Sequence, residues 1–178
     1  MSTGNGHFNL LARVLHWSMA LMIVAMLFIG VTMVASLHLR PALIDLHRPL
    51  GIAILLLALL RLYNRLRHRP PALPADLPVW QGVAAKASHW MLYALMLAMP
   101  LIGWAMLSAG GYPIVLWGGL HLPPIVPHTP ALYAALRNAH SLLAYVLFAT
   151  VLMHVGAALF HLWVRRDGVF QAMARGKD

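Results

Sequence analysis

Cysteine and glutamate are absent from the 178 residues of this chain, and charged residues of any kind are scarce. Without cysteine there are no disulfides, no iron–sulfur clusters and no thiolate ligation of a haem, so any metal chemistry falls to histidine or methionine. Charged residues make up 10% of the chain and hydrophobic residues 61%, a balance that cannot cover a surface exposed to water. We therefore expect an integral membrane protein.

The few charges that are present are mostly positive, with 13 Lys and Arg against four Asp. A strongly basic chain can bind nucleic acid, but here the positive residues form short clusters beside apolar runs, where they orient a membrane protein. The charge pattern therefore predicts a lipid bilayer as the partner and no nucleic acid.

Four apolar stretches approach the roughly 20 residues that a helix needs to cross a bilayer core of about 30 Å. They lie near residues 14–36, 47–64, 87–108 and 132–164. The first has no cleavage site of the usual kind, so we interpret it as a retained helix and not as a signal peptide. The sequence predicts one membrane domain over residues 1–178, an all-α four-helix bundle.

Positive residues also predict how the bundle is oriented. Most of them lie near the two termini or between the second and third stretches: Arg13, Arg65, Arg67, Arg69, Lys86, Arg165, Arg166, Arg175 and Lys177. By the positive-inside rule, both termini are then cytoplasmic. The periplasmic side keeps Arg40, Arg48 and Arg137, together with a segment rich in Pro and Gly, residues 110–130, that is too broken to span.

Eleven histidines are unusual in so apolar a chain, and six of them lie in or at the edges of the apolar stretches. An ionisable side chain within a membrane span is costly and by default suggests function. The six are His16, His47, His89, His140, His154 and His161. The other five lie in loops or tails, where we expect solvated side chains.

The fourth stretch carries two histidines, His140 and His154, that are 14 residues apart. In a helix this spacing is roughly 21 Å along the axis and brings the side chain back to within about 40° of its first direction. One metal ion cannot use two ligands so far apart. Two stacked haems, each taking one ligand from this helix, fit the spacing.

Each haem then needs a second histidine at a matching depth. His47 opens the second stretch on the periplasmic side, level with His140, while His16 and His89 both enter from the cytoplasmic side, so either could face His154. An alternative is that these histidines only form hydrogen bonds across helices, as polar residues in membrane bundles do. Two pairs matched in depth favour the haem interpretation.

Two further residues fit the same geometry. Arg61 lies 14 residues after His47 and shares its helix face, where it could neutralise a haem propionate or extend to the interface. His161 lies seven residues beyond His154 on the same face, about 10 Å nearer the cytoplasm. It could bind a quinone carbonyl or a propionate, or be an interfacial histidine.

Four segments, in this order and spacing, carry a family resemblance: RVLHW, DLHRPLGIAILLLALLRL, SHWMLYALMLAMPLIGWAM and NAHSLLAYVLFATVLMHVGAALFHLWVRRDG. Together they resemble the bacterial cytochrome b561 family and, more distantly, the b-type cytochrome subunit of nickel–iron hydrogenases. The resemblance covers nearly the whole chain. It implies a four-helix protein of the bacterial inner membrane that holds two b haems and exchanges electrons with ubiquinone.

By the same resemblance, His16 with His154 would bind the cytoplasmic haem and His47 with His140 the periplasmic haem. Some family members are described as superoxide oxidases. The leading hypothesis is therefore an oxidoreductase that passes electrons from a periplasmic donor, with superoxide as the candidate, to ubiquinone near His161, Lys86 or His89.

Two other functions stay open at this point. The chain could be a haem-bearing membrane anchor subunit of a dehydrogenase or hydrogenase, which would need a soluble partner. It could also be a haem-free proton or metal transporter that uses the same histidines. Association with further copies of the chain, as a homo-oligomer, is open as well.

Overall fold

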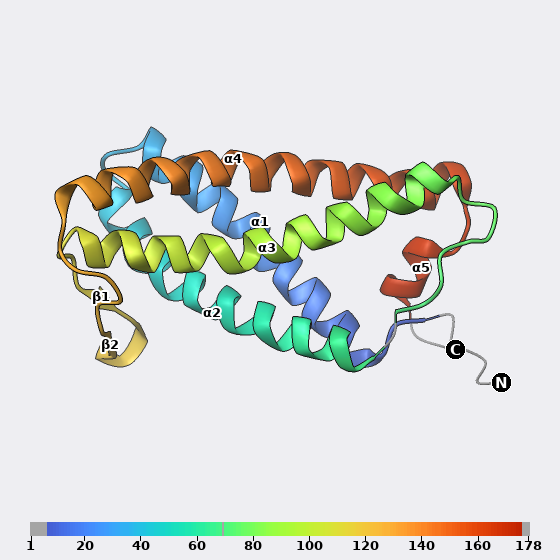
Figure 1. Cartoon of the computed structure of the whole chain (residues 1–178), viewed down its shortest axis with the longest axis horizontal. Helices are drawn as coiled ribbons and strands as arrows, with labels where there is room; N and C mark the ends of the chain where they lie inside the picture. Colours follow the sequence, from blue (N-terminus) through green and yellow to red (C-terminus); the bar gives the residue numbers. More distant parts are fainter. Residues whose placement is uncertain (1–6, 69, 176–178) are drawn as a thin grey trace.

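The computed structural model describes residues 7–68 and 70–175. Within these residues, four long helices form an elongated bundle (Figure 1): α1 (Leu10–Ala35), α2 (Arg40–Arg67), α3 (Val79–Ala109) and α4 (Pro130–Phe160). All four are long and apolar enough to cross a membrane. The prediction of an all-α, four-helix membrane bundle is therefore confirmed.

Each long helix begins earlier than its apolar stretch predicts. α2 begins at Arg40 and not near residue 47, and α3 begins at Val79 and not near residue 87. Hydropathy detects only the part of a helix that lipid covers. Polar turns can extend the helix beyond the lipid, and in α2 a proline in the first turn favours this earlier start. His47 consequently lies about two turns inside α2 and does not open it.

One end of the bundle, which we call the hairpin end, carries the segment between α3 and α4 (Figure 1). Here β1 (Ile114–Val115) pairs antiparallel with β2 (His121–Leu122), and a single 3₁₀ turn, η1 (Trp117–Gly119), connects them. Gly118 and Gly119 have φ of 74° and 78°, values that favour glycine, so the turn depends on both. This segment contains no spanning helix, as the sequence predicts.

The opposite end, the terminal end, carries the first and last described residues and the segment between α2 and α3 (Figure 1). This common side agrees with the predicted topology, while its cytoplasmic location stays a prediction. Arg69 and Lys177, which that prediction uses, lie outside the described residues. Beyond α4, a π-helical turn, η2 (His161–Arg165), leads to a short helix, α5 (Val169–Ala174).

α5 folds back against the start of α1. The backbone N–H of Phe8 donates a hydrogen bond to the carbonyl of Ala172 at 3.1 Å, and the indole Nε1–H of Trp17 donates to the carbonyl of Met173 at 3.3 Å. Two carbonyls at the end of the chain thereby gain partners. The two ends of the described chain are held together across the terminal end of the bundle.

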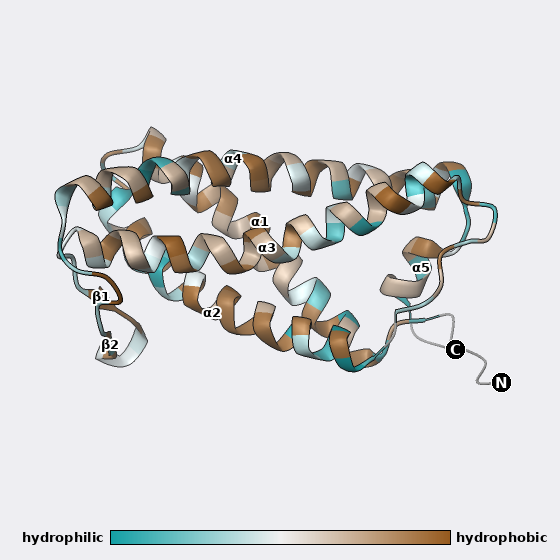
Figure 2. Cartoon of the chain, viewed as in Figure 1, coloured by the Kyte–Doolittle hydropathy of each residue, from teal (hydrophilic) through white to brown (hydrophobic). Residues whose placement is uncertain are grey.

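The buried core lies where α1, α2 and α3 meet. Its fully buried members include Met19 and Ala58. The partly buried side chains packed around them are methionines and aliphatic residues, and methionine is flexible enough to fill irregular gaps between helices. The helices consist mostly of hydrophobic residues along the middle of the bundle, and hydrophilic residues are more frequent toward both ends (Figure 2). That pattern matches a bilayer core between two interfaces.

Replacing Met19 by alanine should lower the free energy of unfolding in detergent by roughly 1–3 kcal/mol, because the cavity removes packing contacts of a side chain that is only 1% exposed. Leu21 on the same helix is 73% exposed, so Leu21→Ala is the matched control. We expect its effect to be under about 1 kcal/mol, since lipid already surrounds that side chain. Equal losses in chemical denaturation would contradict this view of the core.

Candidate haem sites

At the hairpin end, the structure brings together one histidine from α2 and one from α4. The rings of His47 and His140 have their centres 6.2 Å apart, with their planes at 66°. Both side chains are half-buried between the helices. The expected match in depth between these two histidines is therefore present.

Nearer the terminal end, His154 of α4 has two histidine neighbours. The ring of His16 from α1 lies 6.2 Å away at 67°, and the ring of His89 from α3 lies 5.5 Å away at 64°. Both rings that the sequence left as alternatives thus lie beside His154. This half of the bundle contains a cluster of three histidines.

The distances within these pairs can be compared with the size of a metal ion. One ion held between two imidazole nitrogens puts the ring centres about 6 Å apart, because each bond is about 2 Å and each ring centre lies about 1 Å beyond its nitrogen. His47–His140 and His16–His154, both at 6.2 Å, match this separation, while His89–His154 at 5.5 Å is shorter. Two facing imidazoles are the axial donor set of a b-type haem.

Hydrogen bonding gives a second test of the fit. The Nδ1 atoms of His16, His47 and His140 are buried and have no hydrogen-bond partner among the described residues. A buried polar atom without a partner is costly, so a ring that only joined two helices by a hydrogen bond would satisfy its nitrogens. The Nδ1 atoms of these three rings therefore form no cross-link between the described helices.

Glycine makes room beside the hairpin-end pair. A Cβ added to Gly103 of α3 would lie 3.4 Å from Cε1 and 3.7 Å from Nδ1 of His140, whereas one added to Gly30 of α1 would have nothing within 4 Å. Gly103 therefore lets α3 approach the ring closely. Gly30 borders open space that a flat macrocycle can use.

All four helices follow the same 14-residue spacing. The pairs are His16 and Gly30 on α1, His47 and Arg61 on α2, His89 and Gly103 on α3, and His140 and His154 on α4. Two residues 14 positions apart lie on nearly the same face of a helix, about 21 Å apart along its axis. Each helix therefore places one member of its pair near His140, which we call the hairpin-end level, and the other near His154. The hairpin-end level then has two histidines and two glycines, and the other level has three histidines and an arginine.

The two glycines of this pattern were missed in the sequence. Glycine within an apolar helix has no chemistry of its own, and it was not considered beside the histidines. The signal that could have found them is the 14-residue spacing itself, applied from His16 and His89 as it was from His140.

Arg61 lies at the level of the three histidines, as its spacing predicts. Its guanidinium is half-buried, stands 5.8 Å from the centre of the Tyr93 ring, and is close enough for its charge to act on His16 and His154. Its alternative role, extension to the interface, stays open. A positive charge beside a candidate haem is suited to a propionate.

The remaining candidates lie nearer the terminal end. Lys86 is exposed on α3, one turn beyond His89. His161 begins the π-helical turn, and its Nδ1 lies 2.7 Å from Oδ2 of Asp167. The sequence did not predict this carboxylate partner.

An apolar groove runs between α3 and α4 beside the three histidines. Its volume is about 530 Å³, and its lining includes Ser88, Met91, Thr150 and Met153. Ser88 and Met153 are the sequence neighbours of His89 and His154. The groove is open to the lipid-facing surface, and no histidine is among the described residues that line it.

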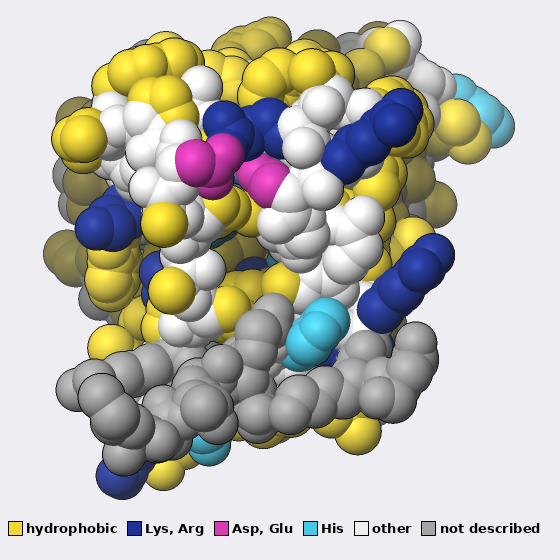
Figure 3. All heavy atoms as spheres, turned by 90° about the vertical axis from the view of Figure 1, so that its right-hand side faces the viewer, with side chains coloured by type: hydrophobic (Ala, Val, Ile, Leu, Met, Phe, Trp, Pro, Cys, Tyr) yellow, Lys and Arg dark blue, Asp and Glu magenta, His cyan; other side chains and the backbone are white. Residues whose placement is uncertain are grey.

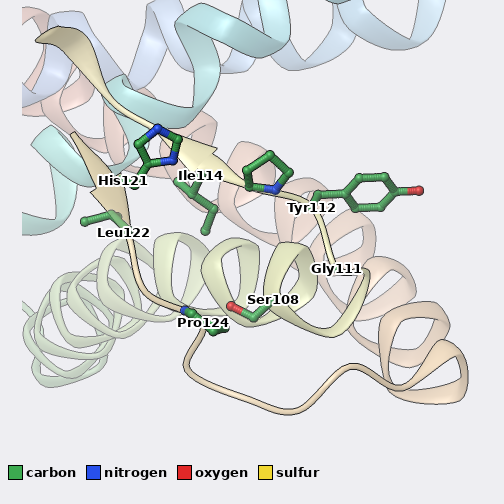
Figure 4. A pocket seen from close by; sticks show the side chains of 8 residues that line it. Ser108, Gly111, Tyr112, Ile114, His121, Leu122 and Pro124 are labelled. Carbon is green, nitrogen blue, oxygen red and sulfur yellow. The ribbon is translucent and has the colours of Figure 1, made fainter. Parts of the chain in front are cut away.

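A second cavity, of about 320 Å³, lies under the hairpin (Figure 4). Ser108, Tyr112 and His121 provide its polar groups. His121 is exposed, as expected for a histidine between the helices. The cavity itself has no signal in the sequence, because the folded hairpin creates it. The hairpin is held to α3 by hydrogen bonds such as that from Nε1 of Trp104 to the carbonyl of Pro123, at 2.9 Å.

Comparison with known proteins agrees with this geometry. A family model described as prokaryotic cytochrome b561 matches residues 7–176. The chain is 32% identical to a probable superoxide oxidase, CybB, of Yersinia pestis, over 89% of the chain and 90% of that protein. It is 29% identical to cytochrome b561 homolog 1 of Escherichia coli (strain K12), over 89% and 92%, and 27% identical to cytochrome b561 homolog 2 of the same organism, over 93% and 90%.

The family match spans almost every described residue, including all five histidines of the two candidate sites. It confirms the resemblance found in the sequence and accounts for the four apolar helices. The chain therefore belongs to the prokaryotic cytochrome b561 family, and is a multi-pass b-type cytochrome of the bacterial inner membrane that acts in electron transfer.

Proposed function

We propose that this protein holds two b haems and transfers electrons from superoxide on the periplasmic side to ubiquinone in the membrane. The observation that carries the proposal is the presence of two facing histidine pairs with the same ring separation, 6.2 Å, on helices that place them at different depths. With two such pairs at different depths, an electron could cross the membrane in short steps from one haem to the next.

In this proposal His47 and His140 hold the periplasmic haem, and His16 and His154 hold the cytoplasmic haem. A bound haem supplies reversible one-electron chemistry, with a potential that axial ligands, burial and nearby charge adjust. With two histidines available to hold each haem, the sites would be suited to electron transfer and not to oxygen binding. Arg61 supplies a positive charge for a propionate of the cytoplasmic haem.

The histidine that this assignment leaves free, His89, becomes a candidate for quinone. It lies beside His154, and the apolar groove of about 530 Å³ between α3 and α4 is lined by Ser88 and Met153, the sequence neighbours of these two histidines. An apolar groove that ends in a few polar groups is the usual form of a site for a lipid-soluble ligand. His161 and Lys86 lie further toward the terminal end, where protons would enter.

The direction of transfer rests on charge and on one relative. The positive-inside rule makes the terminal end cytoplasmic, so the hairpin end faces the periplasm with Arg40, Arg48 and Arg137, which can attract an anion. The Yersinia pestis relative is named a probable superoxide oxidase. The name of this relative supports superoxide as the donor, whereas three arginines are little positive charge for attracting an anion.

The proposed function can be tested on the purified protein by absorption spectroscopy. We expect superoxide to produce the reduced b-type α band, and ubiquinone to remove it again. A band that appears with dithionite but never with superoxide would overturn the donor. The absence of any such band with dithionite would overturn the haem assignment.

The ligand assignment predicts how haem content depends on individual histidines. His140→Ala and His16→Ala should each remove one of the two haems, because each leaves a site with a single axial ligand. His89→Ala should keep both haems, which makes it the control for the cytoplasmic pair. Loss of a haem from His89→Ala, with full retention in His16→Ala, would reverse the assignment.

Gly103 gives a separate prediction about space. Gly103→Leu should remove the hairpin-end haem, because the new side chain would occupy the place that the His140 ring and the macrocycle need. Gly156→Leu is the matched control, since Gly156 is exposed on α4 and has nothing within 4 Å of an added Cβ. Equal haem-to-protein ratios in both variants would show that Gly103 does not border a haem.

A further inference from the structure

Asp167 makes a set of contacts at the terminal end that the electron-transfer proposal does not use. Its Oδ2 atom lies 2.7 Å from Nδ1 of His161 and accepts a hydrogen bond from Nε of Arg165 at 2.9 Å. Its Oδ1 atom accepts a hydrogen bond from the backbone N–H of Val169 at 3.3 Å. The Asp167 side chain is only 10% exposed, so its carboxylate is almost completely surrounded by protein.

The local backbone is shaped to make this contact. In the π-helical turn η2, the N–H of Arg166 donates to the carbonyl of His161 at 2.8 Å, and Arg166 itself has φ of 53°. The wide π-helical turn and the left-handed Arg166 together reverse the chain direction. The side chain of Asp167 therefore lies against the imidazole of His161. Such π turns in helices occur frequently at functional sites.

A second carboxylate reinforces the arrangement from another segment. Nη2 of Arg165 donates to Oδ2 of Asp76, in the segment between α2 and α3, at 2.8 Å. Acidic and basic side chains accordingly gather on the terminal-end face of the bundle (Figure 3). Two of the four acidic residues of the chain therefore converge on Arg165, but only Asp167 also contacts a histidine.

Asp167 is ionised under ordinary conditions. Burial alone would raise the pKa of its carboxyl, but the hydrogen bonds from His161, Arg165 and the Val169 N–H outweigh burial and hold the pKa below its usual value. An ionised carboxylate can only accept hydrogen bonds. A neutral His161 must therefore carry its proton on Nδ1 and leave Nε2 without one.

We propose that Asp167 is a positioning residue, which orients His161 so that its Nε2 delivers a proton to ubiquinone as the quinone is reduced. This inference rests on the proposed function. Reduction of one ubiquinone to ubiquinol takes two electrons, supplied by the periplasmic donor, and two protons from the cytoplasmic side. In the step assigned to His161, the Nε2–H bond breaks, an O–H bond forms on the quinone, and water returns the proton to Nε2.

The carboxylate has two effects on this step. It fixes the ring and its tautomer, because the hydrogen bond at one nitrogen decides which form the other nitrogen takes. It also stabilises the imidazolium that exists before the proton leaves, as in other carboxylate–histidine pairs. Removing such a partner typically costs tenfold to a hundredfold in activity, and we expect about that range here.

The test compares Asp167→Asn with Asp76→Asn in the full-length, haem-loaded protein. Both variants remove a carboxylate that contacts Arg165, and only the first removes the partner of His161. After reduction, ubiquinone-driven oxidation should be about tenfold to a hundredfold slower in Asp167→Asn and nearly unchanged in Asp76→Asn. Asp167→Glu, which keeps the charge, should recover part of the rate.

A second readout needs no quinone. The ¹⁵N spectrum of labelled histidine, with the His161 signals identified by their loss in His161→Gln, should show the Nδ1–H tautomer in the unaltered protein and in Asp76→Asn. It should show a shift toward the Nε2–H tautomer in Asp167→Asn. An unchanged α band in every variant would confirm that the haem sites are intact.

The outcomes separate the two proposals. If ubiquinone fails to oxidise the unaltered protein, the proposed function falls and this inference falls with it. If ubiquinone oxidises the unaltered protein and Asp167→Asn equally fast, or if the tautomer of His161 does not depend on Asp167, only this inference is overturned. An Asp76→Asn variant as slow as Asp167→Asn would also overturn it, because the effect would then belong to the ion-pair network as a whole.

Discussion

An imidazole inside a membrane span must find a partner, because lipid offers none and an unsatisfied polar group there is costly. In this protein His47 faces His140, and His16 faces His154, at a ring separation that fits one metal ion between the two rings. This constraint accounts for the 14-residue spacing on all four helices. Gly30 and Gly103 lie at the hairpin-end level, where a macrocycle between helices would need positions without side chains.

The helices and the histidine pairs were predictable from sequence because both follow from spacing. Apolar length predicted four spans, and the interval between His140 and His154 predicted two levels. The bounds of the helices were less predictable, since the turns beyond the lipid are polar and hydropathy does not detect them. His47 was accordingly placed at the start of α2, although it lies well inside the helix.

Other features depend on tertiary contacts that have no periodic signal. Asp167 follows His161 by six residues, a spacing that places the two side chains apart on a regular α-helix, and only the π turn and the left-handed Arg166 bring them together. The hairpin between α3 and α4 was expected to be irregular, but its two short strands and the cavity beneath them arise from pairing across a glycine turn.

The central claim is that this one chain holds two haems, each between two histidines. The most direct measurement is the haem-to-protein ratio of the purified protein, together with low-temperature electron paramagnetic resonance of its oxidised form. The account predicts two haems in each chain, both low-spin, because imidazoles occupy both axial positions. A single haem in each chain, or a high-spin signal from either site, would contradict it.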